Sequence, residues 1–157
     1  MKTILCAVDG TESAEPALEF AIEMSQATHA ELYTIAVKPS VIEGRGSAIA
    51  VHPFDDAHGA AAIADAAAST ARAAGVEAHA SLAVGHTVEE IATAAERLEA
   101  DLVVVGSRRL GRVSSAVRGS VSHALARRCP VPVTVVASPR RDADEPRHAG
   151  SPQDVAG

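Results

Sequence analysis

The chain has 157 residues, of which 47% are hydrophobic but only 2% aromatic, and its formal net charge at pH 7 is −6. This length suits a single domain, whose core must be built from valine, isoleucine, leucine and a large number of alanines. No segment reaches the roughly 18 consecutive apolar residues of a membrane span, and residues 1–10 turn polar too early for a signal peptide, so we expect a cytoplasmic protein without membrane partners.

The charge is unevenly distributed along the chain. Residues 102–141 hold eight arginines and no acidic residue, which gives that segment a formal charge of +8 and leaves −14 for the rest. One basic segment in an acidic protein indicates a local anion site rather than nucleic-acid binding. Cys6 and Cys129 lack a Cys-x-x-Cys spacing and lie in or beside apolar runs, so we expect buried free thiols in a reducing compartment.

The first half of the chain alternates between strand and helix patterns. Residues 4–8 form a short apolar run, which predicts a strand covered on both faces. The apolar spacing from Leu18 to Ser25 predicts a helix, with Pro16 in its first turn, where proline is harmless. Residues 32–37 read as the second strand.

A long loop is expected over residues 39–58, because that segment has prolines, glycines and no sustained periodicity. An alanine-rich helix then runs from about Asp56 to Ala74 and stops at Gly75, and residues 76–84 form the third strand.

The second half continues the alternation. Thr87 and Glu90 have the spacing of a capping box, in which the Thr87 hydroxyl caps the next helix. Residues 102–105 read as the fourth strand, 120–128 as a helix and 131–137 as the fifth strand. Strands that alternate with helices predict a doubly wound, Rossmann-like α/β fold with a parallel sheet. The domain is expected over residues 1–138, followed by a disordered tail over 139–157.

Two predicted strand ends carry residues suited to a ligand, because ligands of open parallel sheets bind beyond the carboxyl ends of the strands. Asp9 follows the first strand, although its carboxylate could instead simply order its own turn. Gly106 opens a Gly/Ser/Arg loop after the fourth strand, and this loop leads to Gly119 and Ser120 at a helix start. Glycines allow close backbone approach, and a helix amino terminus attracts phosphate, so this second segment is typical of an anion cradle.

These residues carry a family resemblance. Gly106, two residues, Arg109, nine residues and Gly119-Ser120 resemble the universal stress protein signature, whose usual form is Gly-x2-Gly-x9-Gly-Ser/Thr. Residues 4–10 also resemble the opening of that family, and the likeness extends to about residue 137. The resemblance implies a five-stranded parallel sheet of order 3-2-1-4-5, of the adenine nucleotide α-hydrolase-like type. It also implies a homodimer formed partly through the last strand, residues 131–137.

The resemblance further implies a nucleotide site, with ATP and Mg²⁺ as the expected ligands. By position, Asp9 and the backbone of Val37 would hold the adenosine. Gly106 and the start of the last helix would cradle the phosphates, through Gly119, Ser120, Val121 and Ser122.

One position departs from the signature, since Arg109 stands where the family has its second glycine. Either Arg109 closes the phosphate loop and abolishes ATP binding, or its guanidinium points outward or grips the phosphates itself.

Three functions follow as alternatives: an ATP-binding regulatory protein of the stress response, a nucleotide-free dimeric adaptor, and an adenylating enzyme. The third is disfavoured because residues 9–13 lack a Ser-Gly-Gly-type loop. The chain also lacks a P-loop lysine, so any ATP hydrolysis should be slow. The seven histidines form no metal-binding motif, and no serine has the Gly-x-Ser-x-Gly frame of a nucleophile.

Overall fold

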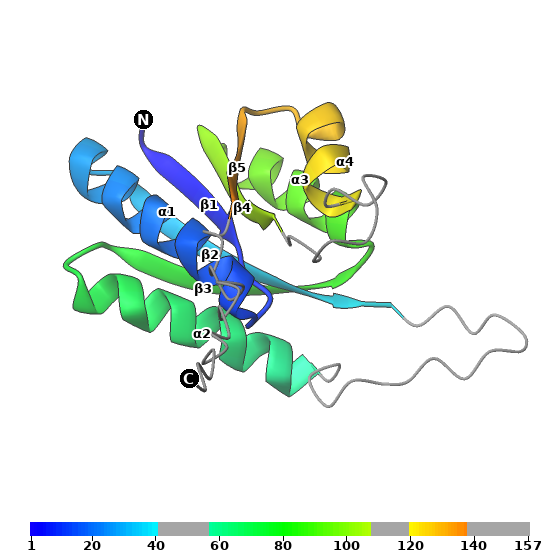
Figure 1. The fold of residues 1–157 in the computed structure, drawn as a ribbon, viewed down its shortest axis with the longest axis horizontal. Helices are drawn as coiled ribbons and strands as arrows, with labels where there is room; N and C mark the ends of the chain where they lie inside the picture. The colour runs from blue at the N-terminus through cyan, green and yellow to red at the C-terminus, as the bar shows by residue number, and fades with distance from the viewer. Residues whose placement is uncertain (41–56, 108–119, 138–157) are drawn as a thin grey trace, which may run out of the picture.

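The structure is a computed structural model that describes residues 1–40, 57–107 and 120–137 (Figure 1). In chain order its elements are β1 (Thr3–Ala7), the short 3-10 helix η1 (Glu12–Ala14), α1 (Glu15–Thr28), β2 (Glu31–Pro39), α2 (Ala57–Ala73), β3 (Ala78–Gly85), α3 (Thr87–Arg97), β4 (Leu102–Ser107), α4 (Ser120–Arg128) and β5 (Val133–Ala137). The five strands form one parallel sheet in the order β3-β2-β1-β4-β5, which confirms the predicted topology.

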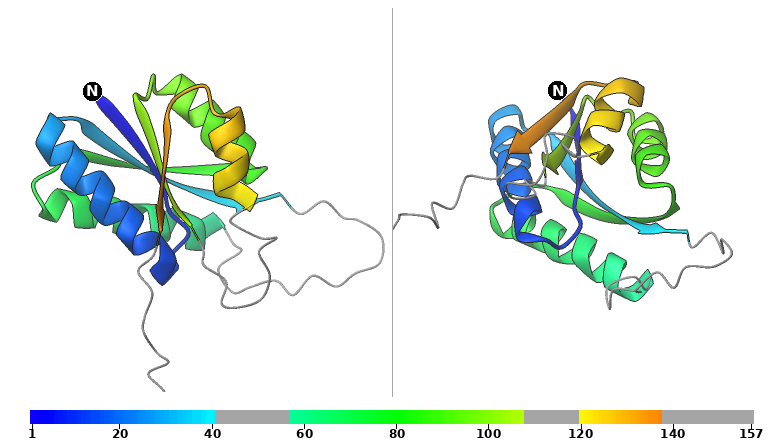
Figure 2. Two further views of the ribbon diagram at one scale, coloured as in Figure 1. Left: turned by 45° about the horizontal axis from the view of Figure 1, so that its top comes forward. Right: turned by 45° about the vertical axis from the view of Figure 1, so that its right-hand side comes forward.

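The helices cover the sheet in two layers, with α1 and α2 on one face and α3 and α4 on the other (Figure 2). The strands at the centre are apolar on both sides, as the run over residues 4–8 predicted: Ile4, Leu5 and Cys6 of β1 are all fully buried. Side chains alternate between the faces of a strand, so Ile4 and Cys6 face α1 and α2, whereas Leu5 faces the other layer.

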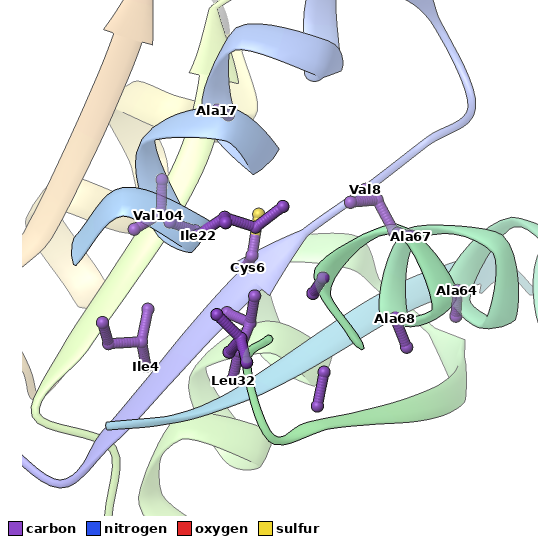
Figure 3. Packing of buried hydrophobic residues seen from close by; sticks show 14 of the residues in the cluster. Ile4, Cys6, Val8, Ala17, Ile22, Leu32, Ala64, Ala67, Ala68 and Val104 are labelled. Atoms are coloured by element: carbon purple, nitrogen blue, oxygen red, sulfur yellow. The ribbon is translucent and has the colours of Figure 1, made fainter. Parts of the chain in front are cut away.

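The core under α1 and α2 is made largely of small side chains (Figure 3). Ala64, Ala67 and Ala68 of α2 belong to this core, and α2 packs against β2 and β3. Burial raises the pKa of the Cys6 thiol to about 12, because the thiolate would lose its hydration in this apolar site. Cys129 is only half-buried, so the expectation of two buried thiols holds for Cys6 alone.

The start of α3 differs from the prediction. The capping residue is His86, Thr87 is already helical, and no side chain caps this helix. The Glu90 N–H donates to the His86 carbonyl at 2.9 Å. The capping box is therefore wrong, because the helix begins one residue earlier and a backbone carbonyl takes the hydrogen bond assigned to the Thr87 hydroxyl.

Asp101 ties β1 to β4 at the amino edge of the sheet. Its Oδ2 accepts the backbone N–H groups of Lys2 at 2.5 Å and Thr3 at 3.0 Å. These two hydrogen bonds lower the pKa of the Asp101 carboxyl, since they favour its charged form.

The last strand is shorter than predicted, beginning at Val133 rather than at residue 131. Pro132 lacks an N–H for the ladder, although its carbonyl accepts the Val103 N–H at 2.9 Å. The expected tail, 139–157, and most of the expected loop, 39–58, lie outside the described residues. Within the described ranges, every helix is too short or too polar to cross a bilayer.

Candidate functional site

The candidate site lies at the carboxyl edge of the sheet, beyond β1 and β4. These neighbouring strands mark the point where the winding reverses, because β2 and β3 extend the sheet on one side and β5 on the other. Ala7 of β1 pairs with Val105 of β4, so Asp9 and Gly106 follow at the same edge of the sheet. The structure thus brings together the two strand ends singled out from the sequence, at the position where doubly wound sheets bind ligands.

The Asp9 carboxylate orders the turn that follows β1. Its Oδ1 accepts the Thr11 N–H at 3.0 Å and the Thr11 hydroxyl at 2.6 Å. The Thr11 and Ser13 hydroxyls are hydrogen-bonded to each other at 2.8 Å, and Gly10 adopts a positive φ of 74° between them and Asp9. The turn-ordering interpretation of Asp9 is therefore confirmed, and the carboxylate is held in a fixed, exposed place at the sheet edge.

Gly106 has a packing reason for being glycine that the sequence did not reveal. A Cβ built on Gly106 would lie 2.6 Å from the backbone oxygen of Ser13 and 3.3 Å from the Cα of Ala14. The short helix η1 can cross the end of β4 only because no side chain stands there. Gly106 therefore fixes the distance between the Asp9 turn and the end of β4.

Val37 lies at the same edge, in β2. It pairs with Ala83 of β3, and it follows Ile35, the residue that pairs with Ala7 at the end of β1. The Val37 side chain is half-buried against the core under α3 and α4. Its backbone therefore stands just beyond the end of β1, where the sequence interpretation places the adenosine.

The start of α4 also belongs to this edge. The helix connects the parallel strands β4 and β5, so it runs back across the sheet and its amino end, Ser120, lies at the carboxyl edge. The Val121 side chain is 39% exposed, whereas Ser122 is only 6% exposed and shares the buried face of α4 with Leu125.

The predicted phosphate loop is described only in part. Gly119 and Arg109 lie outside the described residues. The roles assigned to these two residues, and to Ser120, Val121 and Ser122, remain predictions. Thr11 and Ser13 were missed altogether, although the Asp-x-Thr spacing after a strand was a usable signal for an ordered turn.

The chain was compared with protein families, curated proteins and solved structures. It matches the model of the universal stress protein family over residues 1–137. The comparison with curated proteins gave no match.

Three solved structures illustrate the similarity in fold. A universal stress protein from Archaeoglobus fulgidus is 23% identical, with a TM-score of 0.72 over 86% of this chain and 98% of that one. A universal stress protein in complex with cAMP is 29% identical, with a TM-score of 0.67 over 86% and 96% of the two chains. A family protein from Arabidopsis thaliana with AMP bound is 18% identical, with a TM-score of 0.66 over 93% and 98%.

The family model spans every described residue and ends at the last residue of β5. The strand order and the ligand-suited edge agree with it. The chain belongs to the universal stress protein family.

Proposed function

We propose that this protein binds an adenine nucleotide, ATP in the first place, at the carboxyl edge of its sheet and acts as a regulatory protein in the cytoplasm. The observation that carries the proposal is the juxtaposition of Asp9 and Gly106 on neighbouring strands at the point where the winding reverses. The similarity to a universal stress protein solved with cAMP supports an adenine nucleotide as the ligand class.

Each group at the edge has a chemical role to offer. The fixed Asp9 carboxylate can accept hydrogen bonds from ribose hydroxyls, and its turn is ordered before any ligand arrives, which lowers the entropic cost of binding. We expect the backbone of Val37, just beyond the end of β1, to contact the adenine ring. The amino end of α4 offers the partial positive charge of a helix amino terminus to the phosphates.

Thermal melting with millimolar AMP, ADP and ATP, each with and without Mg²⁺, tests the proposal. A ligand at 100 times its Kd stabilises the native state by about 2.7 kcal/mol, which is a readily measured rise in Tm. Gly119→Val should remove that rise without changing the Tm of the free protein, since its Cβ branch would occupy the phosphate position. An unchanged melt with all three nucleotides would favour the second candidate, a nucleotide-free dimeric adaptor.

Substitutions of Arg109 distinguish the nucleotide-binding protein from the nucleotide-free adaptor. Arg109→Gly restores the usual signature, so a rise in nucleotide affinity would mean that the arginine obstructs the site. A fall in affinity would mean that the guanidinium binds the phosphates, and Arg109→Lys would then retain part of the affinity.

The same proposal includes a homodimer through the last strand. β5 is an edge of the sheet, and its Val135 side chain is 42% exposed, which favours pairing with a second copy. Sedimentation should give a dimer, and Val135→Lys should dissociate it. A monomer at micromolar concentration would overturn this part.

Catalysis is expected to be weak at most. Phosphate release from ATP should stay far below typical enzyme turnover, and no adenylated product should form with amine or carboxylate acceptors. Rapid turnover would instead support an adenylating or hydrolytic enzyme.

A further inference from the structure

A groove runs between α1 and α2, and Gly10 and Thr11 of the turn after β1 line one end of it, so the groove adjoins the candidate nucleotide site. The two helices lie side by side there (Figures 1 and 2). The groove encloses about 480 Å³, with Val8 at its floor, Leu18 on the α1 wall, and Ile63 and Ala66 on the α2 wall. Its volume falls in the range of ligand pockets, and its lining is mostly apolar.

The α2 wall is built of small side chains. Ala62, Ala66 and Thr70 recur every fourth residue, line the groove and are exposed. The Thr70 hydroxyl donates to the Ala66 carbonyl of its own helix at 3.0 Å, so this wall presents no charge and little polarity. A second helix can approach such a wall closely, because no long side chain holds the two backbones apart.

The α1 wall is bordered by acidic side chains. Glu15 lines the groove, and Glu19 and Glu23 follow at four-residue spacing on the same side of the helix, all three exposed. α1 contains no lysine or arginine, and within the described ranges no cation pairs with these carboxylates.

The position of these acids along α1 is itself informative. Glu15 suits the first turn of a helix, whereas Glu19 and Glu23 lie beyond it and repel each other at i,i+4. Intrinsic helix stability therefore does not explain the stripe. Its uncompensated negative charge is complementary to a cationic surface.

We propose that the groove is the docking site for a basic amphipathic helix of a partner protein. Apolar side chains at i, i+3, i+4 and i+7 of that helix enter the groove, and its lysines and arginines flank α1 and pair with Glu15, Glu19 and Glu23. The stripe is about 12 Å long at 1.5 Å per residue, so a partner helix of about three turns spans it. This inference does not depend on nucleotide binding.

Three fluorescent peptides of about 15 residues test the proposal. The first has leucines on one face and lysines along its flank, the second replaces the lysines with glutamates, and the third has the composition of the first in an order that destroys the apolar face. Fluorescence anisotropy with the full chain should show binding of the first peptide and at least about tenfold weaker binding of the other two. NMR shifts should map to Leu18, Ala62 and Ala66.

Two variants of the protein and a matched control test whether the peptide binds in the groove beside the acidic stripe. Glu19→Lys/Glu23→Lys should weaken the lysine peptide about tenfold and strengthen the glutamate peptide. The matched control, Asp65→Lys/Glu96→Lys, changes the net charge equally but at exposed sites outside the acidic stripe of α1, and it should keep the order of the peptides. Ala66→Gln places a long side chain in the groove and should abolish binding of the lysine peptide without lowering the Tm.

Several outcomes would overturn the proposal. Equal weakening by Glu19→Lys/Glu23→Lys and by the control would mean that net charge alone attracts the peptide. Equal affinity for the scrambled peptide, or shifts that map elsewhere, would exclude the groove. If Ala66→Gln dissociates a homodimer, the occupant is a second copy; if it moves the resonances of residues 138–157, the occupant is this chain's own end.

Discussion

The two helical layers cover the same sheet with side chains of different size. The buried side chains described on α2 are all alanine, as at Ala64 and Ala68, whereas α3 and α4 each bury a large residue completely, Ile91 and Leu125. Among the described residues, the fully buried hydroxyl side chains, Thr34 of β2 and Ser25 of α1, both lie on this side of the sheet. One layer is therefore held by the close approach of small side chains, and the other by large apolar anchors.

The small side chains allow a contact that larger ones would prevent. The Thr34 hydroxyl in β2 donates directly to the Ala64 carbonyl in α2 at 2.8 Å. A sheet side chain reaches a helix backbone in this way only where the helix axis lies close to the sheet. The alanine content therefore accounts for both the close approach of α2 and the open groove beside it, because small side chains do not fill the space between helices.

The largest effect is expected in the anchored layer. Leu125→Ala should lower the free energy of unfolding by about 2–5 kcal/mol, because it removes a fully buried side chain and leaves a cavity. Urea denaturation measures it, and Arg127→Ala on the exposed side of the same helix is the control. A loss below about 1 kcal/mol would mean that α4 does not depend on its anchor.

The converse change in the alanine layer should cost less. Ala68→Leu adds a large side chain where Ala68 is fully buried, and we expect a loss of about 1–3 kcal/mol. Ala66→Leu, at an exposed position on the groove wall, should have little effect. Tolerance of Ala68→Leu would show that α2 does not lie as tightly on the sheet as its alanines indicate.

Thr34→Val tests the polar contact directly. It keeps the shape of the side chain but leaves the Ala64 carbonyl without the hydroxyl, so stability should fall by about 1–2 kcal/mol. Thr70→Val, at an exposed hydroxyl, is the matched control. If Thr34→Val is neutral, apolar packing alone holds α2.

Ser25→Ala should raise the stability, whereas the preceding substitutions lower it. The Ser25 Oγ is buried and has no hydrogen-bond partner in the described part of the chain. Replacing it removes the cost of burying a polar group and favours the helix, so stability should rise by about 1 kcal/mol. A loss of stability would reveal a partner for this hydroxyl.

The smallest change in stability is expected from replacing Asp101, which ties β1 to β4 in the sheet that both layers share. Because the folded-state pKa of Asp101 is lowered from its ordinary value of 3.8, its contribution is present above that value and is lost as the pH falls through the folded pKa. Asp101→Asn should therefore lower stability at neutral pH and flatten the acid end of the stability curve. If the curves of stability against pH run parallel for the wild type and Asp101→Asn, Asp101 does not contribute to the acid sensitivity.

Most of the fold could be predicted from the sequence, because its signals are local. The apolar runs over residues 4–8 and 102–105 and the alanine-rich helix correspond to β1, β4 and α2. The strand order came from the family resemblance. The errors lie at the ends of elements, where single backbone groups set the boundary. The His86 carbonyl accepts the hydrogen bond that was predicted for the Thr87 hydroxyl, and Pro132, which has no N–H, delays the start of β5.

The candidate site could be predicted less completely. Asp9 and Gly106 were identified as the ends of neighbouring strands, and the strand order confirms that position. The close contact between Gly106 and Ser13 could not be predicted, because the two segments are far apart in sequence and a glycine gives no sign of what it lies against. The acidic stripe of α1 was readable from its spacing, but its meaning depends on the groove beside it.

Cys6 makes the central strand directly observable in solution. Its thiol is fully buried and its pKa is raised to about 12, so alkylating reagents can reach a reactive thiolate only when the sheet opens around β1. The half-buried Cys129, just after α4, should label sooner. The labelling rate of Cys6, with Cys129 as an internal reference, would report how often the centre of the sheet opens, without any engineered probe.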